Sequence, residues 1–271
     1  MRTLLHLSDL HFGRADERLL APLVEFANGL EPDVVVVSGD LTQRARSRQF
    51  REARRFLDSL PQPRIVVPGN HDVPLHNVFS RFLRPRRKFR RYITGDFAPE
   101  FVDDEIAVLG IDTSRSLTIK NGRVNEAQIE LLRSRLEPLG DDIVKVVVSH
   151  HPFDLPAGHG DSDLVGRAAL AMRVFACSGV DLLLAGHLHV SHAGDTAARY
   201  ALGGYAALVV QAGTATSTRV RGEGNAFNVL RVEASRVGIE RMVWQPGSAV
   251  FACARRESFQ RIGGAWCRAD V

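Results

Sequence analysis

Five short polar segments recur along the chain, and each follows a run of apolar residues. Their side chains are carboxylates, one amide and imidazoles: Asp9 and His11; Asp40; Asn70 with His71 and Asp72; His150; and His187 with His189. Singly such residues are ordinary, because a histidine near a strand end is most often structural and a Gly-Asp pair usually forms a turn or a helix cap. Their recurrence at the same kind of position indicates that they act together.

The chemistry of this set is that of a metal site. Oxygen and imidazole donors without cysteine are typical of sites for Mn, Fe, Zn, Co or Ni, and not of structural zinc–thiolate sites. There are too many donors for one ion. They favour two divalent ions that share a bridging carboxylate, about 3.5–4 Å apart, as in two-metal hydrolases.

The apolar runs and the amphipathic segments between them predict the elements that carry these residues. Strands are predicted over 4–7, 33–37, 64–67, 105–110, 142–148 and 181–185, and helices over 17–30, 48–60, 125–136 and 164–178. Gly179 is predicted to cap the last of these helices. A strand–helix–strand order predicts parallel strands, whose carboxyl ends share the edge at which open α/β sheets bind ligands.

The last third of the chain has a different pattern. Strands are predicted over 206–214, 226–233, 237–244 and 250–255, with a further one over 258–267. With only turns between them they are expected to pair antiparallel. We therefore predict an α/β fold with two mixed sheets flanked by helices, a four-layer αββα sandwich. No linker or repeat divides residues 1–271, which predicts one domain.

An Arg-rich segment over residues 73–100 interrupts the regular pattern. It interleaves apolar residues with seven basic ones: Arg81, Arg84, Arg86, Arg87, Lys88, Arg90 and Arg91. We interpret it as a helical insertion that caps the site or rests on an anionic membrane surface. An ordinary solvated helix face is an equally good interpretation. The net charge of +4 and pI near 9.3 likewise indicate either anionic partners or Arg-rich codon usage.

Composition places the chain among ordinary globular proteins, with 45% hydrophobic and 24% charged residues. Three widely spaced cysteines, Cys177, Cys253 and Cys267, predict free thiols in a reducing compartment. Asp9 arrives too early for a signal peptide, and no apolar run approaches the roughly 20 residues of a membrane span. A cytoplasmic location is therefore expected.

The order and content of the polar segments resemble a known family. Asp9-Leu10-His11, Gly39-Asp40, Gly69-Asn70-His71-Asp72, His150 and Gly186-His187-Leu188-His189 resemble the signature blocks of the calcineurin-like metallophosphoesterases. Within that superfamily the chain is most similar to class III cyclic-nucleotide phosphodiesterases and bacterial glycerophosphodiesterases. The resemblance implies the αββα fold and a dinuclear centre of Mn, Fe or Zn.

The resemblance also implies a role for each residue. Asp9, His11, Asp40 and His189 would hold the first metal, and Asp40, Asn70, His150 and His187 the second. His71 would face the substrate as general acid or electrostatic partner. Asp72 would orient the His71 ring, since a carboxylate can fix an imidazole's tautomer. His151, beside a ligand, is ambiguous: it is expected either to support the ligands or to be structural.

The implied function is hydrolysis of a small anionic phosphodiester, of the cyclic-nucleotide or glycerophosphodiester type, by a hydroxide held between two divalent metals. One alternative is a phospholipid or nucleotide-sugar lipid hydrolase at the membrane surface. Another is a nuclease, which is disfavoured because the chain lacks the aromatic–basic alternation of a strand-binding groove. A metal-binding scaffold without catalysis is disfavoured, because all the predicted ligands and His71 are present. The oligomeric state stays open.

Overall fold

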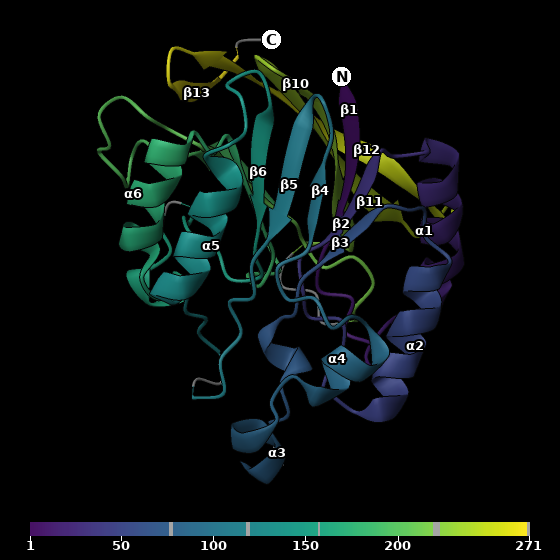
Figure 1. Cartoon of the computed structure of the whole chain (residues 1–271). Helices are drawn as coiled ribbons and strands as arrows, with labels where there is room; N and C mark the ends of the chain where they lie inside the picture. Colours follow the sequence, from purple (N-terminus) through teal and green to yellow (C-terminus); the bar gives the residue numbers. More distant parts are fainter. Residues whose placement is uncertain (76–77, 118–119, 157, 219–222, 270–271) are drawn as a thin grey trace.

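The computed structural model describes residues 1–75, 78–117, 120–156, 158–218 and 223–269. Two β-sheets stack against each other, and helices cover their outer faces (Figure 1). This is the predicted four-layer αββα arrangement of two mixed sheets. Among the described residues, no helix is long and apolar enough to cross a membrane.

The first sheet has seven strands in the order β13-β12-β11-β10-β1-β2-β3. They are β1 (Arg2–Leu7), β2 (Val34–Val37), β3 (Arg64–Val66), β10 (Ala226–Glu233), β11 (Arg236–Gln245), β12 (Val250–Ile262) and β13 (Ala265–Arg268). β1, β2 and β3 are parallel, whereas β10 to β13 form an antiparallel meander that joins β1. The antiparallel pairing of the last third is confirmed, but β12 continues through the predicted break after residue 255.

The second sheet has six strands in the order β4-β5-β6-β7-β9-β8. They are β4 (Glu100–Val102), β5 (Ile106–Gly110), β6 (Val144–Val148), β7 (Leu182–Ala185), β8 (His192–Asp195) and β9 (Leu208–Gln211). β5, β6, β7 and β9 are parallel, and the edge strands β4 and β8 are antiparallel. The strand β8 was not predicted, because His-Ala-Gly-Asp has no apolar alternation; pairing with β9 creates it.

Six helices accompany the sheets in the described chain. They are α1 (Glu17–Leu30), α2 (Ser47–Asp58), α3 (Val78–Leu83), α4 (Arg87–Tyr92), α5 (Glu126–Leu136) and α6 (Ala168–Ser178). The side chain of Asp16 accepts from the first turn of α1, and Asn125 does so for α5. Gly179 ends α6 in the left-handed conformation, as predicted. α6 begins at residue 168 instead of 164, because Arg167 before it is left-handed.

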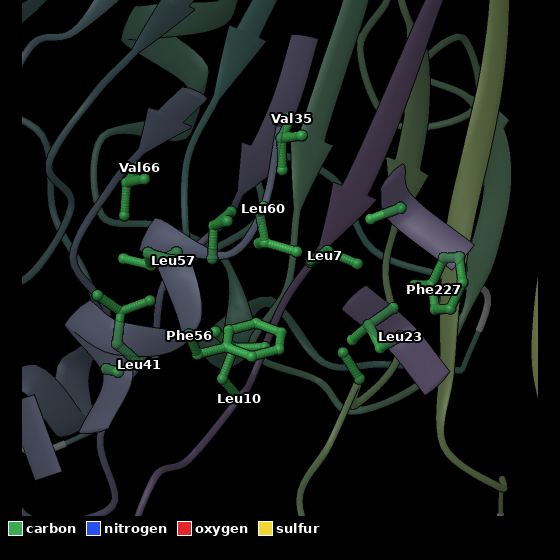
Figure 2. Close-up of a cluster of buried hydrophobic side chains, with 14 of the residues drawn as sticks. Leu7, Leu10, Leu23, Val35, Leu41, Phe56, Leu57, Leu60, Val66 and Phe227 are labelled. Atoms are coloured by element: carbon green, nitrogen blue, oxygen red, sulfur yellow. The ribbon is translucent and has the colours of Figure 1, made fainter. Parts of the chain in front are cut away.

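Three hydrophobic cores hold the four layers together. In β1, Leu4 faces the core between the sheets, whereas Leu5 and Leu7 face the helices. This is the twofold alternation of a strand buried on both faces. Figure 2 shows Leu23 of α1 and Phe56 of α2 packed near Leu7. The third core joins α5 and α6 to the outer face of the second sheet.

The predicted helical insertion consists of α3 and α4. Both lie beyond the lower ends of the strands in Figure 1, and α3 projects furthest from the sheets. The parallel strands β1, β2, β3, β6 and β7 end on the same side of the molecule. The loops that follow them carry the polar segments identified from the sequence.

Candidate metal centre

The donors occupy backbone positions that ordinary side chains avoid. Five of them adopt the left-handed conformation: Asp9 (φ 54°), His11 (φ 49°), Asp40 (φ 53°), His187 (φ 73°) and His189 (φ 61°). Non-glycine residues reach this region at a cost, and surrounding contacts must maintain it. Two such contacts are the hydrogen bonds from Asp9 N to the Gly39 carbonyl (3.1 Å) and from His11 N to the Asp40 carbonyl (2.9 Å). The left-handed residues turn the backbone sharply, so that the donor side chains point toward one another.

The first donor set contains Asp9, His11, Asp40 and His189, all buried. The Nε2 atoms of His11 and His189 lie 3.3 Å apart. Asp9 Oδ1 lies 3.4 Å from His11 Nε2 and 3.1 Å from His189 Nε2. Donors about 2.0–2.2 Å from a shared ion lie about 3.0–3.5 Å from one another, so this spacing fits one divalent cation.

The second set contains the side chains of Asp40, Asn70, His150 and His187. Asn70 Oδ1 lies 3.1 Å from His150 Nε2 and 3.2 Å from His187 Nδ1, and these two nitrogens are 3.3 Å apart. His150 Nε2 lies 3.4 Å from Asp40 Oδ1. The spacing again fits a single ion. The structure thus brings all seven predicted donors into two adjacent groups.

Asp40 belongs to both groups through different oxygens. Its Oδ1 lies near His150, whereas its Oδ2 is 3.7 Å from His11 Nε2 in the first group. The backbone N–H of His71 also donates to Oδ1, at 2.8 Å. A carboxylate held in this way is suited to join two cations.

Buried polar atoms test whether the residues fit such ions. Asp9 Oδ1 is buried and accepts no hydrogen bond within the described residues. A buried acceptor left unpaired costs about 1–3 kcal/mol. Asp9 Oδ1 thus points, without a hydrogen bond of its own, into a cluster of two buried carboxylates and four imidazoles, and these residues fit two divalent ions.

The electrostatics of the site agree with this fit. Burial alone would raise the pKa of Asp40, but the facing imidazoles, His150 foremost, outweigh it and hold the pKa below its usual range. Conversely, burial opposes protonation of His150, but the Asp40 carboxylate raises the pKa of that imidazole to about 9. Without metal a proton balances the carboxylate, and a cation would take its place.

His71 lies beside the donors on the short turn Asn70–Asp72. Its Nδ1 is 2.9 Å from the Gln43 carbonyl, to which it donates, so the neutral ring carries its lone pair on Nε2. The ring meets His11 edge-on, with centroids 4.9 Å apart. It lines a pocket of about 220 Å³ together with Asp40, Asn70 and His187.

The expected role of Asp72 requires a correction. One carboxylate oxygen accepts from Leu41 N (3.1 Å) and Gly69 N (3.0 Å), and the other from Thr42 N and Oγ1 (2.9 Å each). Asp72 therefore fastens the loop that carries Asp40 to the turn that carries His71. The ring of His71 is oriented by the Gln43 carbonyl instead, because the turn directs the carboxylate of Asp72 inward.

Two hydrogen bonds hold the ring of His151. Its Nε2 donates to the Lys120 carbonyl (2.9 Å), and its Nδ1 accepts from Thr113 Oγ1 (2.8 Å). Burial lowers the pKa of this ring, which keeps it neutral. With both nitrogens engaged, His151 supports His187, whose ring centroid lies 4.5 Å away, without joining the donors.

Sequence reasoning missed three residues that line the pocket, namely Gln43, Arg44 and Lys120. Arg44 Nη1 lies 3.5 Å from His71 Nδ1. The position of Gln43 and Arg44 just after Gly39-Asp40 was the available signal. Lys120 had none, because it is placed by contacts with residues far along the chain, such as that of its carbonyl with His151.

Comparison with known proteins identifies the family of the chain and agrees with its fold. Residues 2–191 match the family model of the calcineurin-like phosphoesterases. The chain therefore belongs to the calcineurin-like phosphoesterase family, and the resemblance noted in its sequence is confirmed.

Two relatives of this family are similar in sequence. The chain is 32% identical over 178 residues to the glycerophosphodiester phosphodiesterase GpdQ of Enterobacter lignolyticus, covering 59% of this chain and 60% of the relative. It is 28% identical over 211 residues to a cAMP/cGMP dual specificity phosphodiesterase of Mycobacterium tuberculosis, covering 69% and 62%. The matched region thus spans about three-fifths of each relative's length.

A solved structure shares the fold. The dimetal phosphatase from Danio rerio superposes with a TM-score of 0.62 at 16% identity, over 89% of this chain and 95% of that chain. At this identity the likeness concerns the architecture alone.

Proposed function

We propose that the chain is a metal-dependent phosphohydrolase that cleaves phosphodiesters of small anionic substrates. The observation that carries this proposal is the division of the Asp40 oxygens between two adjacent donor groups. Two divalent ions there would supply the Lewis acidity and activated water of a two-metal hydrolase. Both relatives are phosphodiesterases by name, which favours a diester as substrate.

The chain's own residues would orient the substrate and move a proton. His71 presents a ring whose Nδ1–H the Gln43 carbonyl holds, so Nε2, when protonated, is the atom that would give its proton to the departing oxygen. Arg44, beside that ring, is placed to stabilise negative charge on the phosphoryl group. Val73 and Leu75 form an apolar wall of the pocket for the uncharged part of the substrate.

A substrate panel on the metal-loaded protein tests the proposal. It contains bis-p-nitrophenyl phosphate, p-nitrophenyl phosphate, cyclic AMP, 2′,3′-cyclic nucleotides, glycerophosphodiesters, phospholipids and single-stranded DNA, each with added Mn²⁺. We expect turnover of small diesters that exceeds turnover of the monoester and DNA. The double variant D40N/H71A controls for contaminating hydrolases. Diester turnover equal to that of this variant would refute the proposal.

A further inference from the structure

The excess of positive over negative charge in the chain comes from one segment. Residues 73–95 contain seven of the 35 basic residues and none of the 31 acidic ones. The rest of the chain therefore carries a net charge of −3. A general preference for arginine would spread positive charge over the surface, so its concentration here points to a local role.

Three of the seven basic side chains hold the segment to the site. Arg81 is 6% exposed and donates to the carbonyls of Ser116 (2.6 Å) and Pro74 (3.1 Å). Arg86 pairs with the buried Asp112 and donates to the Ser114 carbonyl (2.8 Å). Lys88 Nζ donates to the carbonyl of Ala45 (2.8 Å). These contacts anchor α3 and α4 on the loops that surround the pocket.

The other four, Arg84, Arg87, Arg90 and Arg91, are exposed, and none pairs with a carboxylate in the part of the chain that the structure describes. Beside them, α3 exposes Phe79 (76%), Phe82 (52%) and Leu83 (62%). We call these four arginines and three apolar residues the docking surface. A groove of about 470 Å³ between α3 and α4 combines both kinds, with Phe79 and Leu83 next to Arg84, Arg87 and Arg91.

Exposed aromatic and aliphatic side chains surrounded by arginine match the interface of an anionic bilayer. Apolar side chains gain by entering the headgroup and acyl boundary, and cations gain by approaching lipid phosphates. A second copy fits poorly, because a twofold contact would oppose two uncompensated arginine clusters. Nucleic acid would satisfy the arginines but offers no apolar phase to the projecting Phe79 and Phe82.

We propose that the docking surface binds the chain to anionic phospholipid membranes. Phe79, Phe82 and Leu83 enter the interfacial layer, and the four exposed arginines contact lipid phosphates. Val73 and Leu75, which lead into α3, line the pocket, so a docked chain holds its pocket close to the membrane. This inference concerns binding and goes beyond the proposed hydrolysis.

Vesicle co-sedimentation of the metal-loaded chain tests the proposal. The vesicles are phosphatidylcholine alone or phosphatidylcholine mixed with phosphatidylglycerol. The charge variant is R84Q/R87Q/R90Q/R91Q, and the apolar variant is F79S/F82S/L83S. R55Q/R173Q/R236Q/R256Q removes the same charge from exposed positions elsewhere and is the matched control. Turnover of soluble bis-p-nitrophenyl phosphate is measured for every variant.

We expect the wild-type chain to partition onto the anionic vesicles and not onto the neutral ones. Partitioning of the charge variant onto anionic vesicles should be about tenfold or more weaker than that of the wild type, and the apolar variant should be weakened by a comparable factor. The matched control should partition like the wild type. Diester turnover should not change in either variant, which separates docking from hydrolysis.

Other outcomes overturn the proposal. Equal loss in the matched control would show nonspecific attraction by net charge, and unchanged partitioning of the apolar variant would show that the apolar residues do not insert. Absence of wild-type partitioning would exclude membrane docking. Sedimentation velocity on the same samples identifies the alternative of a second copy, because F79S/F82S/L83S would then convert a dimer to a monomer. Binding of wild-type chain to single-stranded DNA with no vesicle binding would indicate a nucleic-acid surface.

Discussion

At the scale of single residues, Asp40 is the most constrained side chain of the centre. Its backbone is left-handed, its two oxygens serve different donor groups, and one of them also accepts from His71 N. Gly39 before it has φ +90°, and a Cβ there would lie 2.7 Å from His150 Nδ1. Only glycine therefore allows the Asp40 loop to lie against a donor histidine.

Replacing Asp40 by Asn should weaken both candidate metal sites, because the neutral amide removes the charge that two bound ions would share. We expect metal content after dialysis to fall from about two ions per chain to less than one. Inductively coupled plasma mass spectrometry measures the metal content. D142N, at an exposed position, should keep the wild-type content. Loss of only one ion from D40N would show that Asp40 serves one site alone.

Replacing His71 by Ala should separate catalysis from metal binding. The side chain of His71 lies outside both donor groups, so metal content should stay at the wild-type level. Diester turnover should fall about 10²–10⁴-fold, the usual range for a lost proton-transfer group. Initial rates of diester hydrolysis and the metal content are measured on the same preparation. If the variant lost metal together with activity, His71 would belong among the ligands.

At the scale of elements, the α3–α4 segment is joined to the second sheet by buried polar contacts. Arg86 of this segment reaches Asp112, which follows β5 and is 3% exposed. Asp112 also accepts from Ser114 N (2.8 Å) and Oγ (2.6 Å). The buried Asp112 carboxylate requires Arg86 as its partner, because an unpaired buried charge is strongly unfavourable.

Replacing Arg86 by Met should therefore lower the free energy of unfolding by about 3 kcal/mol, the cost of leaving Asp112 without its partner. Urea denaturation measures the change. R87M is the matched control, since Arg87 is exposed and pairs with no carboxylate among the described residues. The double variant R86M/D112N should recover part of the loss. Equal stability of R86M and R87M would mean that the pair contributes nothing.

At the scale of the whole molecule, buried polar groups join strands that lie far apart in sequence. Asp181, which directly precedes β7, accepts from Lys145 N (2.9 Å), Arg261 Nη1 (2.8 Å) and Trp266 Nε1 (2.9 Å). These contacts connect the last strands of the first sheet to the second sheet. His6, in β1, is fully buried, and its Nε2 lies 2.9 Å from Ser38 Oγ.

Stability should depend on pH through His6. Burial, opposed in part by Asp9, lowers the pKa of His6 from 6.5 to about 3. As the pH falls from 6.5 towards 3, the unfolded chain binds a proton that the folded chain excludes, so the free energy of unfolding decreases.

In the metal-free protein, H6Q should flatten this decrease by up to about 1.4 kcal/mol per pH unit. Urea unfolding at several pH values measures the slope, with H159Q, on a partly exposed loop, as the control. An unchanged slope in H6Q would mean that His6 is protonated in the folded state.

Much of the fold was predictable from local patterns. The apolar run Val34 to Val37 reads as a buried strand, and the amphipathic pattern of residues 17–30 reads as a helix whose bounds match α1. A strand that forms only through pairing, such as β8, gives no apolar pattern from which it could be predicted. The start of α6 was also misplaced, because the left-handed Arg167 ends the helical pattern without a sequence signal.

The sequence by itself predicted which residues come together at the candidate metal centre. Parallel strands end at a common edge, so the residue types at strand ends are enough to place Asp9, Asp40 and His187 near one another. Only the tertiary structure decided how they are used: which Asp40 oxygen serves which group, that Gln43 and not Asp72 orients His71, and that Arg81 and Arg86 turn inward. The orientations of these side chains depend on contacts between loops that are far apart in the sequence. Such contacts leave no periodic pattern along the chain.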